Sequence, residues 1–208
     1  MKKALLGLIR RLLMKMTQTK AYHFFMKSIL PYIRFTMYYP SFPGSQYHKA
    51  SLLVRAGDII LCKDNRKLTT ALIGGIYSHA GMCFVSNDSI IIVADFSHID
   101  GQRRTFFDLC KESDDICILR CRDFDDQYIA QVVLRASDLI KSTPYDLSFE
   151  LGVKALYCSE FIYEADFERR LQVSLEDLAG LGVPYISPTG LYLAKNVDIV
   201  YESAKNKR

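Results

Sequence analysis

The run Leu156-Tyr157-Cys158-Ser159-Glu160-Phe161-Ile162-Tyr163 marks a change of pattern in this chain, because an apolar stretch becomes helical there. We predict a helix over residues 158–171, with Phe161 and Ile162 among the side chains available for burial. Cys158 is then the first helical residue. A thiol at a helix N-terminus feels the positive end of the backbone dipole, which lowers its pKa and raises the thiolate fraction.

An imidazole that could serve this thiol is found far upstream. His79 opens a short strand-like run, His79-Ala80-Gly81-Met82-Cys83-Phe84-Val85. An imidazole facing a thiol can accept its proton, which is the arrangement of an activated cysteine nucleophile. The structural alternative is a buried apolar cysteine and a core histidine at a strand start.

The cysteine and histidine spacing argues against a structural metal. No Cys-x-x-Cys motif occurs, and the four histidines are scattered at positions 23, 48, 79 and 98. We expect neither a metal nor another cofactor. In the absence of an export signal, the six cysteines predict a reducing compartment rather than three disulfides.

The remaining pattern predicts an α+β domain with an antiparallel sheet. A helix with one apolar face is predicted at 125–141, and a shorter helix at 68–76. Residues 39–45 are typical of a linker or turn. Strands are predicted at residues 57–62, 79–85, 89–95, 115–121 and 196–201.

The beginning of the chain is strongly basic. Residues 1–57 contain ten Lys or Arg and no Asp or Glu, whereas the remaining 151 residues contain 17 basic and 23 acidic side chains. Residues 3–16 have the period of an amphipathic helix, and residues 20–39 add aromatic, helix-like sequence that Pro31 kinks or ends. Two interpretations fit equally well: a segment that lies on an anionic membrane, and an extra helical layer on the domain. We divide the chain into a basic amphipathic helical leader, 1–50, and a domain, 51–208.

The leader does not have the pattern of a signal peptide. Its apolar run, residues 4–9, meets Arg10 and Arg11 after six residues, whereas a signal core needs about 7–15 and a membrane span about 20. We therefore expect a cytoplasmic protein that contacts anionic membrane peripherally through residues 1–40. Nucleic acid is not an expected partner, because the apolar, aromatic face suits lipid better than phosphate alone. The sequence leaves the oligomeric state open.

Four short blocks together resemble the signature blocks of the NlpC-type papain-like superfamily in circularly permuted order. The order is similar to that of the permuted branch, which includes YaeF/YiiX-type and YebB-type amidases and, more distantly, lecithin:retinol acyltransferase. The resemblance covers about residues 52–200 and implies a permuted papain-like fold, in which an antiparallel sheet or barrel packs against helices. The blocks are Gly57-Asp58-Ile59-Ile60-Leu61, Ser78-His79-Ala80-Gly81-Met82, Pro144-Tyr145-Asp146 and Tyr157-Cys158-Ser159-Glu160-Phe161.

The resemblance implies a role for each matching residue. Cys158 corresponds to the nucleophile and His79 to the general base that later acts as an acid. Tyr145 corresponds to a substrate-binding tyrosine whose hydroxyl helps to bind the carbonyl oxygen, although a tyrosine at the core edge is nearly as good an interpretation. Asp95 corresponds to the third catalytic group, which orients the imidazole, and His98 is the alternative.

Three further assignments remain open or structural. Asp95 could equally cap the turn at 95–100. Glu160 lies about 200° around the helix from Cys158 and is interpreted as a first-turn carboxylate. Asp58 is assigned to a structural turn.

These roles predict a cysteine-dependent hydrolase, a thiol amidase or peptidase that acts through an acyl-enzyme on Cys158. The first alternative is a lipid-directed acyl hydrolase or acyltransferase at a membrane surface, which the basic leader favours. The second is a catalytically inactive binding module, against which the intact Cys/His pair argues. The expected substrate is accordingly a peptide amide or a lipid acyl group.

Overall fold

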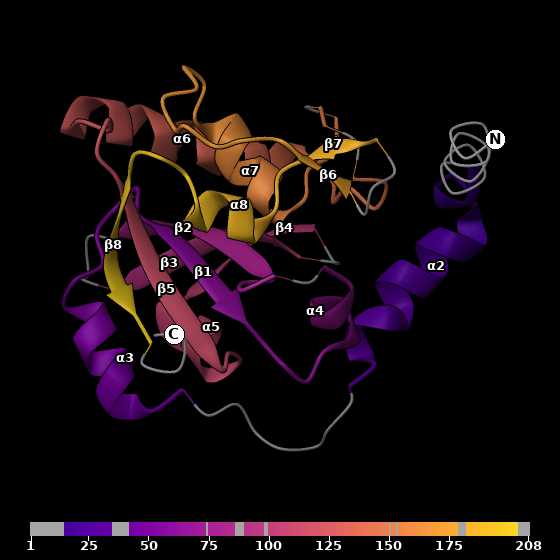
Figure 1. Ribbon diagram of the computed structural model, residues 1–208, viewed down its shortest axis with the longest axis horizontal. Coiled ribbons are helices and arrows are strands. Elements are labelled where there is room, and N and C mark those ends of the chain that lie inside the picture. Colours follow the sequence, from indigo (N-terminus) through magenta and orange to yellow (C-terminus); the bar gives the residue numbers. More distant parts are fainter. Residues whose placement is uncertain are drawn as a thin grey trace.

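A six-stranded antiparallel sheet lies at the centre of the protein, as the computed structural model shows (Figure 1). The structure describes residues 15–34, 42–73, 75–85, 90–97, 100–149, 151–152, 154–178 and 182–203. The strand order along the sheet is β4-β3-β2-β1-β5-β8. The strands are Ile59–Lys63 (β1), His79–Val85 (β2), Ile91–Ser97 (β3), Asp100–Thr105 (β4), Asp115–Cys121 (β5) and Val197–Glu202 (β8).

The sheet is open at both edges. Within the described residues, β4 pairs only with β3 and β8 pairs only with β5. The α+β architecture is therefore confirmed, and of the sheet and the barrel that the sequence allowed, the structure has the open sheet. Two short strands, Glu176–Asp177 (β6) and Pro184–Tyr185 (β7), form a separate ribbon.

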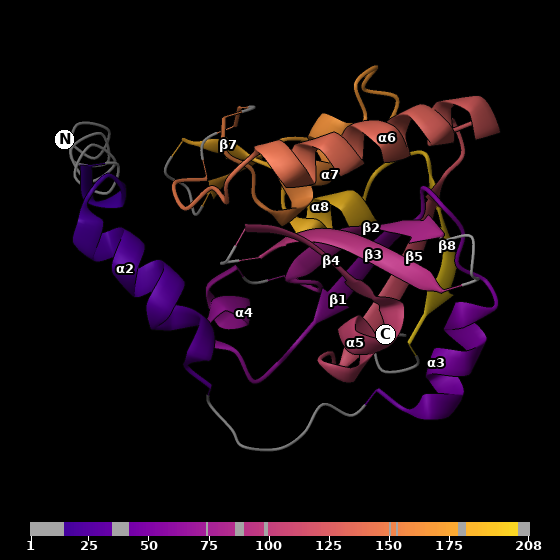
Figure 2. The same ribbon diagram turned by 180° about the vertical axis from the view of Figure 1, so that it is seen from behind.

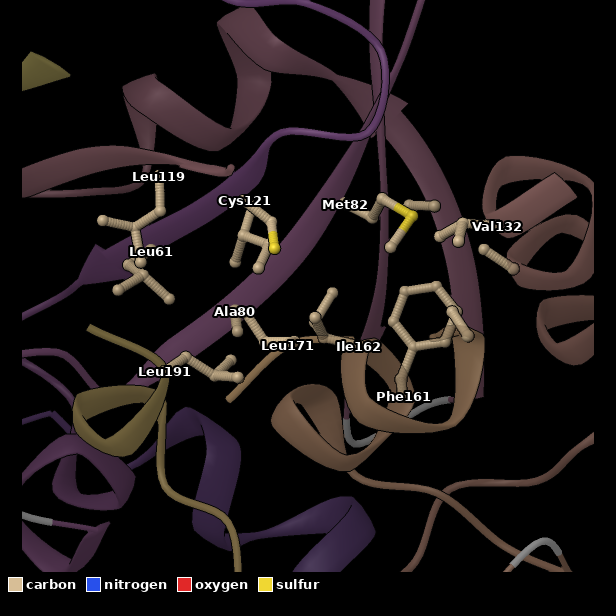
Figure 3. Close-up of a cluster of buried hydrophobic side chains, with 14 of the residues drawn as sticks. Leu61, Ala80, Met82, Leu119, Cys121, Val132, Phe161, Ile162, Leu171 and Leu191 are labelled. Carbon is tan, nitrogen blue, oxygen red and sulfur yellow. The ribbon is translucent and has the colours of Figure 1, made fainter. Parts of the chain in front are cut away.

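Three helices cover one face of the sheet: Asp126–Ser142 (α6), Cys158–Ala165 (α7) and Pro188–Tyr192 (α8). Figure 2 shows them together above the strands. Leu61 and Met82 of the sheet lie in one buried cluster with Phe161 of α7, Val132 of α6 and Leu191 of α8 (Figure 3). This core holds the start of α7 close to the sheet.

The opposite face is covered by Gly44–Ser51 (α3) and Phe106–Lys111 (α5). Ala50 of α3 and Phe106 of α5 are buried with Ile60 and Cys62 of β1. Because side chains alternate between the two faces of a strand, and both faces are covered, β1 is apolar along the run Ile59-Ile60-Leu61-Cys62. A further helix, Leu68–Ile73 (α4), follows β1.

The N-terminal segment lies beside these layers. It contains a helix, Lys20–Ser28 (α2), and a 3-10 turn, Leu30–Tyr32 (η1), and Figure 1 shows it standing outside the sheet next to α4. Thr19 caps α2 by accepting a hydrogen bond from the Tyr22 N–H, and Pro31 falls in η1, after the helix has ended. Most of the helix predicted at 3–16 lies outside the described residues. No helix among those described is long and apolar enough to span a bilayer.

The helix predicted at 158–171 is shorter than expected, because α7 ends at Ala165. The buried Asp166 carboxylate accepts hydrogen bonds from the Arg170 and Leu171 N–H groups at 3.1 and 2.6 Å, and from the Tyr128 hydroxyl. These bonds turn the chain away from the helical path, and Arg169 takes a positive φ of 56°. A buried aspartate therefore overrides the apolar periodicity.

Other differences lie where the sequence carries weak signals. Residues 39–45 were expected to form a linker, but α3 begins at Gly44. β4 was not predicted, because its sequence, Asp-Gly-Gln-Arg-Arg-Thr, has no apolar residue to alternate. The short helices α5 and α8 were also missed.

Candidate active site

Cys158 occupies the first position of α7 and is buried. Its two neighbours are both fixed to Ile186: the Tyr157 hydroxyl accepts a hydrogen bond from the Ile186 N–H at 2.9 Å, and the Ser159 hydroxyl donates to the Ile186 carbonyl at 2.7 Å. Glu160 accepts a hydrogen bond from the Gly152 N–H at 2.6 Å. The backbone that carries the thiol is therefore held in one position by hydrogen bonds from both sides of Cys158.

His79 lies at the first position of β2 and faces both Cys158 and Asp95. Its Nε2 is 2.6 Å from Asp95 Oδ2, and its side chain is hydrogen-bonded to Cys158. Because Nε2 is occupied by Asp95, Nδ1 is the ring nitrogen that remains for the thiol. The imidazole thus lies between a carboxylate and a sulfur, which is the order of a catalytic triad.

Gly81 permits the close approach of Asp95 to β2. Gly81 and Asp95 are paired across β2 and β3, and a Cβ at residue 81 would lie 2.7 Å from Val93 Cγ1 and 3.2 Å from Asp95 Cβ. The first distance is shorter than side-chain carbons tolerate and the second is tight, so a larger residue would push against Val93 and Asp95 of β3. The glycine therefore keeps the strand carrying Asp95 near the strand carrying His79.

Arg104 of β4 is a further member of the site, which the sequence did not indicate. Its Nη2 donates to Asp95 Oδ2 at 2.7 Å and its Nη1 donates to Glu112 Oε2 at 2.9 Å. Asp95 is completely buried, so its charge needs partners. Burial raises the pKa of Asp95, but His79 and Arg104 more than compensate and hold that pKa below its usual range. Asp95 is therefore a carboxylate bound to His79 and Arg104.

The thiol and the imidazole shift each other's pKa in opposite directions. Burial raises the pKa of Cys158, but the hydrogen bond and charge of His79 outweigh burial and lower it below its ordinary value. Burial lowers the pKa of His79, but its hydrogen bonds to Asp95 and Cys158 raise it to about 10. Both shifts favour the thiolate–imidazolium form of the pair.

Tyr145 is brought to the thiol by pairing between two chain segments. It forms an isolated parallel bridge with Leu156, two residues before Cys158. The Leu156 N–H donates to the Pro144 carbonyl and the Asp146 N–H donates to the Leu156 carbonyl, both at 3.0 Å. Burial and the charge of Cys158 raise the pKa of Tyr145, so its phenol remains a neutral donor.

Of the remaining candidates, the structure describes Asp58 but not His98. His98 lies outside the described residues, so its role as alternative third group stays a prediction. Asp58 does not line the cavity described below and accepts hydrogen bonds from the Arg55 N–H at 2.7 Å and from the Arg120 guanidinium at 2.7 and 2.8 Å. These contacts hold the turn in which Gly57 has a φ of 81°.

A cavity of about 460 Å³ adjoins the four side chains, and Cys158, His79, Tyr145 and Arg104 all line it. Its volume falls within the roughly 300–1,000 Å³ of small-ligand pockets. Among the described residues, no group of three or more His, Cys, Asp or Glu side chains is arranged to hold a metal ion. The arrangement suits covalent catalysis by a thiolate.

Comparison with known proteins identifies the family and a structure of similar fold. A family model described as "permuted papain-like amidase enzyme, YaeF/YiiX, C92 family" matches residues 53–190. The crystal structure of "metalloprotein yiiX" from Escherichia coli O157:H7 is similar in fold, with a TM-score of 0.62 and 17% sequence identity. The similarity covers 73% of this chain and 98% of that chain. No curated protein matches the sequence.

Proposed function

Because the chain belongs to the permuted papain-like amidase family, we propose that it is a cysteine hydrolase that cleaves amide bonds through an acyl-enzyme on Cys158. The observation that carries this proposal is the position of the His79 ring, with Nε2 2.6 Å from the buried Asp95 carboxylate and a hydrogen bond to Cys158. Such an arrangement activates a nucleophile and protonates a leaving group.

In the first half-reaction, the Cys158 thiolate attacks the carbonyl carbon of the substrate amide. The carbon–sulfur bond forms, and negative charge develops on the carbonyl oxygen. The neutral Tyr145 hydroxyl, which lines the same cavity, is a suitable donor to that oxygen. His79 then gives its proton to the departing amine, the carbon–nitrogen bond breaks, and the thioester remains.

In the second half-reaction, water resolves the thioester. His79, now neutral, takes a proton from water as the resulting hydroxide attacks the carbonyl carbon. The tetrahedral intermediate releases the acid and the Cys158 thiolate, and His79 retains the proton. Asp95 stabilises the imidazolium in the resting state and at the end of the cycle, and Arg104 keeps Asp95 ionised.

The crystal structure of similar fold is described as that of a metalloprotein. The described residues of this chain do not fit a metal centre, because no three of their His, Cys, Asp or Glu side chains are grouped to hold an ion. We therefore assign every step to the side chains named above.

A lipid-directed acyl hydrolase or acyltransferase is the second candidate. The observation in its favour is the apolar wall that α2 and η1 contribute to the cavity, where Met26, Leu30 and Pro31 lie. The chemistry at Cys158 would be the same, and only the acyl donor and the acyl acceptor would differ. An inactive binding module is disfavoured, because it has no need for a paired thiolate and imidazolium.

Intact-mass measurement of acyl adducts tests the proposal. The donors are a p-nitrophenyl ester, a short-chain phospholipid and a γ-glutamyl peptide amide. We expect an adduct on Cys158 that is absent in Cys158→Ala and forms about 100-fold more slowly in His79→Ala. Cys62→Ala is the matched control, because Cys62 lines the same cavity and has no imidazole assigned to it. Equal acylation of the parent and Cys158→Ala would refute the mechanism, and the fastest donor separates peptide from lipid chemistry.

A further inference from the structure

One wall of the cavity beside Cys158 is built by the N-terminal segment. Met26 of α2 and Leu30 and Pro31 of η1 line the cavity. Leu30 and Pro31 are buried although they lie outside the sheet and its covering helices, and Met26 is half-buried. The match to the amidase family begins at residue 53, so this wall lies outside the matched region.

Two contacts attach α2 to the segment that carries Tyr145. The Tyr22 hydroxyl donates to the Leu147 carbonyl at 2.9 Å. Lys27 Nζ lies 3.7 Å from Asp100 Oδ1, and the same oxygen accepts a hydrogen bond from the Tyr145 N–H at 3.0 Å. The wall and the candidate oxyanion donor are therefore connected through Leu147, two residues after Tyr145, and through Asp100, which accepts the Tyr145 N–H.

The end of the segment is attached separately. Arg34 forms an isolated antiparallel bridge with Lys67, in the loop that precedes α4. The segment is thus tied to the domain along its length, at Tyr22, Lys27 and Arg34. These ties hold α2 and η1 against the cavity.

The surroundings of this wall suit an apolar group. Apolar side chains from other elements also line the cavity, among them Phe96 of β3 and Leu147. The cationic lining residues already contact carboxylates: Arg104 contacts Asp95 and Glu112, Lys67 Nζ lies 3.8 Å from Asp64, and His79 contacts Asp95. Recognition of an anionic substrate group would have to compete with these pairs, whereas an apolar group gains by burial.

We propose that the α2–η1 wall binds an apolar acyl group of the substrate and directs its carbonyl carbon to Cys158. The site then selects acyl donors with a long or bulky apolar acyl part over small ones. This inference rests on the proposed function for its biological meaning, but the binding preference of the wall can be measured without turnover.

The two faces of α2 offer a matched pair of variants. Met26 lines the cavity, whereas Phe24, two residues earlier on the same helix, has 63% of its surface exposed. Met26→Gln places an amide in the wall, and Phe24→Gln places the same amide in solvent. Both variants introduce the same residue into α2, so they differ in the side chain removed and in whether the new amide faces the cavity or solvent.

The experiment compares the rates at which iodoacetamide and N-octyl iodoacetamide alkylate Cys158, followed by peptide mass spectrometry. For the parent protein we expect the octyl reagent to react at least about tenfold faster. Met26→Gln should lose most of that preference, and Phe24→Gln should keep it. Circular dichroism of both variants checks that they are folded.

Three results would overturn the inference: no preference in the parent, a full preference in Met26→Gln, or an equal loss in both variants. The alkylation ratio is independent of hydrolysis. A protein that shows the ratio but forms no acyl adduct from any donor would contradict the proposed function and leave the wall supported. A protein that forms acyl adducts but shows no preference for the octyl reagent would support the proposed function and contradict the role of the wall.

Discussion

The Asp95 carboxylate contacts Nε2 of the His79 imidazole. One oxygen of Asp95 contacts both His79 and Arg104, and the carboxylate has no exposure to solvent. A buried carboxylate in contact with two cations keeps its charge, and that charge favours the imidazolium. We therefore propose that the reactivity of Cys158 depends on Asp95 through the ring of His79, although the two side chains belong to different elements.

The pH dependence of kcat/KM follows from these shifts. The reactive form needs a deprotonated Cys158 and a protonated His79. The rate should rise through a Cys158 pKa that lies below the ordinary thiol value, and fall as His79 loses its proton near pH 10. Asp95→Asn removes the charge that raises the His79 pKa, so the falling limb should move to lower pH. A falling limb that stays in place would show that Asp95 does not hold the proton on His79.

Arg104 is predicted to be a positioning residue. In Arg104→Gln, Asp95 loses one of its two cations and the donor that orients it, so kcat/KM should fall about 10–100-fold and Arg104→Lys should recover part of the loss. The rising limb of Cys158 alkylation should also shift to higher pH, because a displaced Asp95 carboxylate supports the imidazolium less. Stopped-flow alkylation across a pH series measures this shift.

Arg103→Gln is the control for this prediction. Arg103 lies on the same strand, but its guanidinium contacts Ser137 and the Phe84 ring instead of Asp95. Equal losses in the Arg103 and Arg104 variants would indicate a loss of β4 itself and contradict the positioning role.

The residues of the site differ in how far the sequence could predict them. Cys158, His79 and Tyr145 lie in recognisable blocks, and Asp95 ends an apolar strand, so each could be nominated from the chain. Arg104 could not, because β4 is a polar edge strand and its partner choice depends on pairing with β3. The local sequence pattern does not reveal contacts that depend on the register between two strands.

Elements with strong apolar periods were predicted well, and their ends less well. The helix over 125–141 corresponds to α6, and four of the five predicted strands have nearly the observed bounds. The end of α7 was wrong by six residues, because it is set by the buried Asp166 side chain and not by the period of apolar residues. A single polar residue that bonds the backbone can end a helix that periodicity would continue.

Asp166→Ala should destabilise the protein by about 2–3 kcal/mol, because it leaves the buried Leu171 N–H and the Tyr128 hydroxyl without their acceptor. Urea denaturation monitored by circular dichroism measures the change. Asp138→Ala, at an exposed position of α6, is the control and should change stability by no more than about 0.5 kcal/mol. A similar small effect for Asp166→Ala would mean that water replaces the carboxylate.

At the scale of the whole molecule, charge is divided unevenly along the chain. Residues 1–57 carry all ten of their charges as Lys or Arg, while the rest of the chain has six more acidic than basic residues. α2 lies in the basic part, with Met26 toward the cavity and Phe24, Ile29 and Tyr32 of the segment exposed. Exposed aromatic residues among basic ones are typical of a segment that contacts an anionic lipid surface.

We therefore predict that the protein cosediments with phosphatidylserine-containing vesicles at low ionic strength and is released at about 0.5 M salt. Phe24→Gln should weaken this binding severalfold, and Met26→Gln should not. Phe24→Gln is therefore the test variant here and Met26→Gln the control, whereas in the alkylation experiment Met26→Gln is the test variant. Parent protein that stays in the supernatant with anionic vesicles would contradict the membrane prediction and favour a helix that serves only as a cavity wall.

The position of β8 has a consequence for synthesis of the chain on the ribosome. β8 pairs with β5, whose other neighbour β1 is made much earlier. A nascent chain that ends before residue 197 therefore leaves the backbone edge of β5 open, after the rest of the sheet has been translated. Prematurely terminated chains should carry this edge into the cell and self-associate, even though they already contain every residue assigned to the active site.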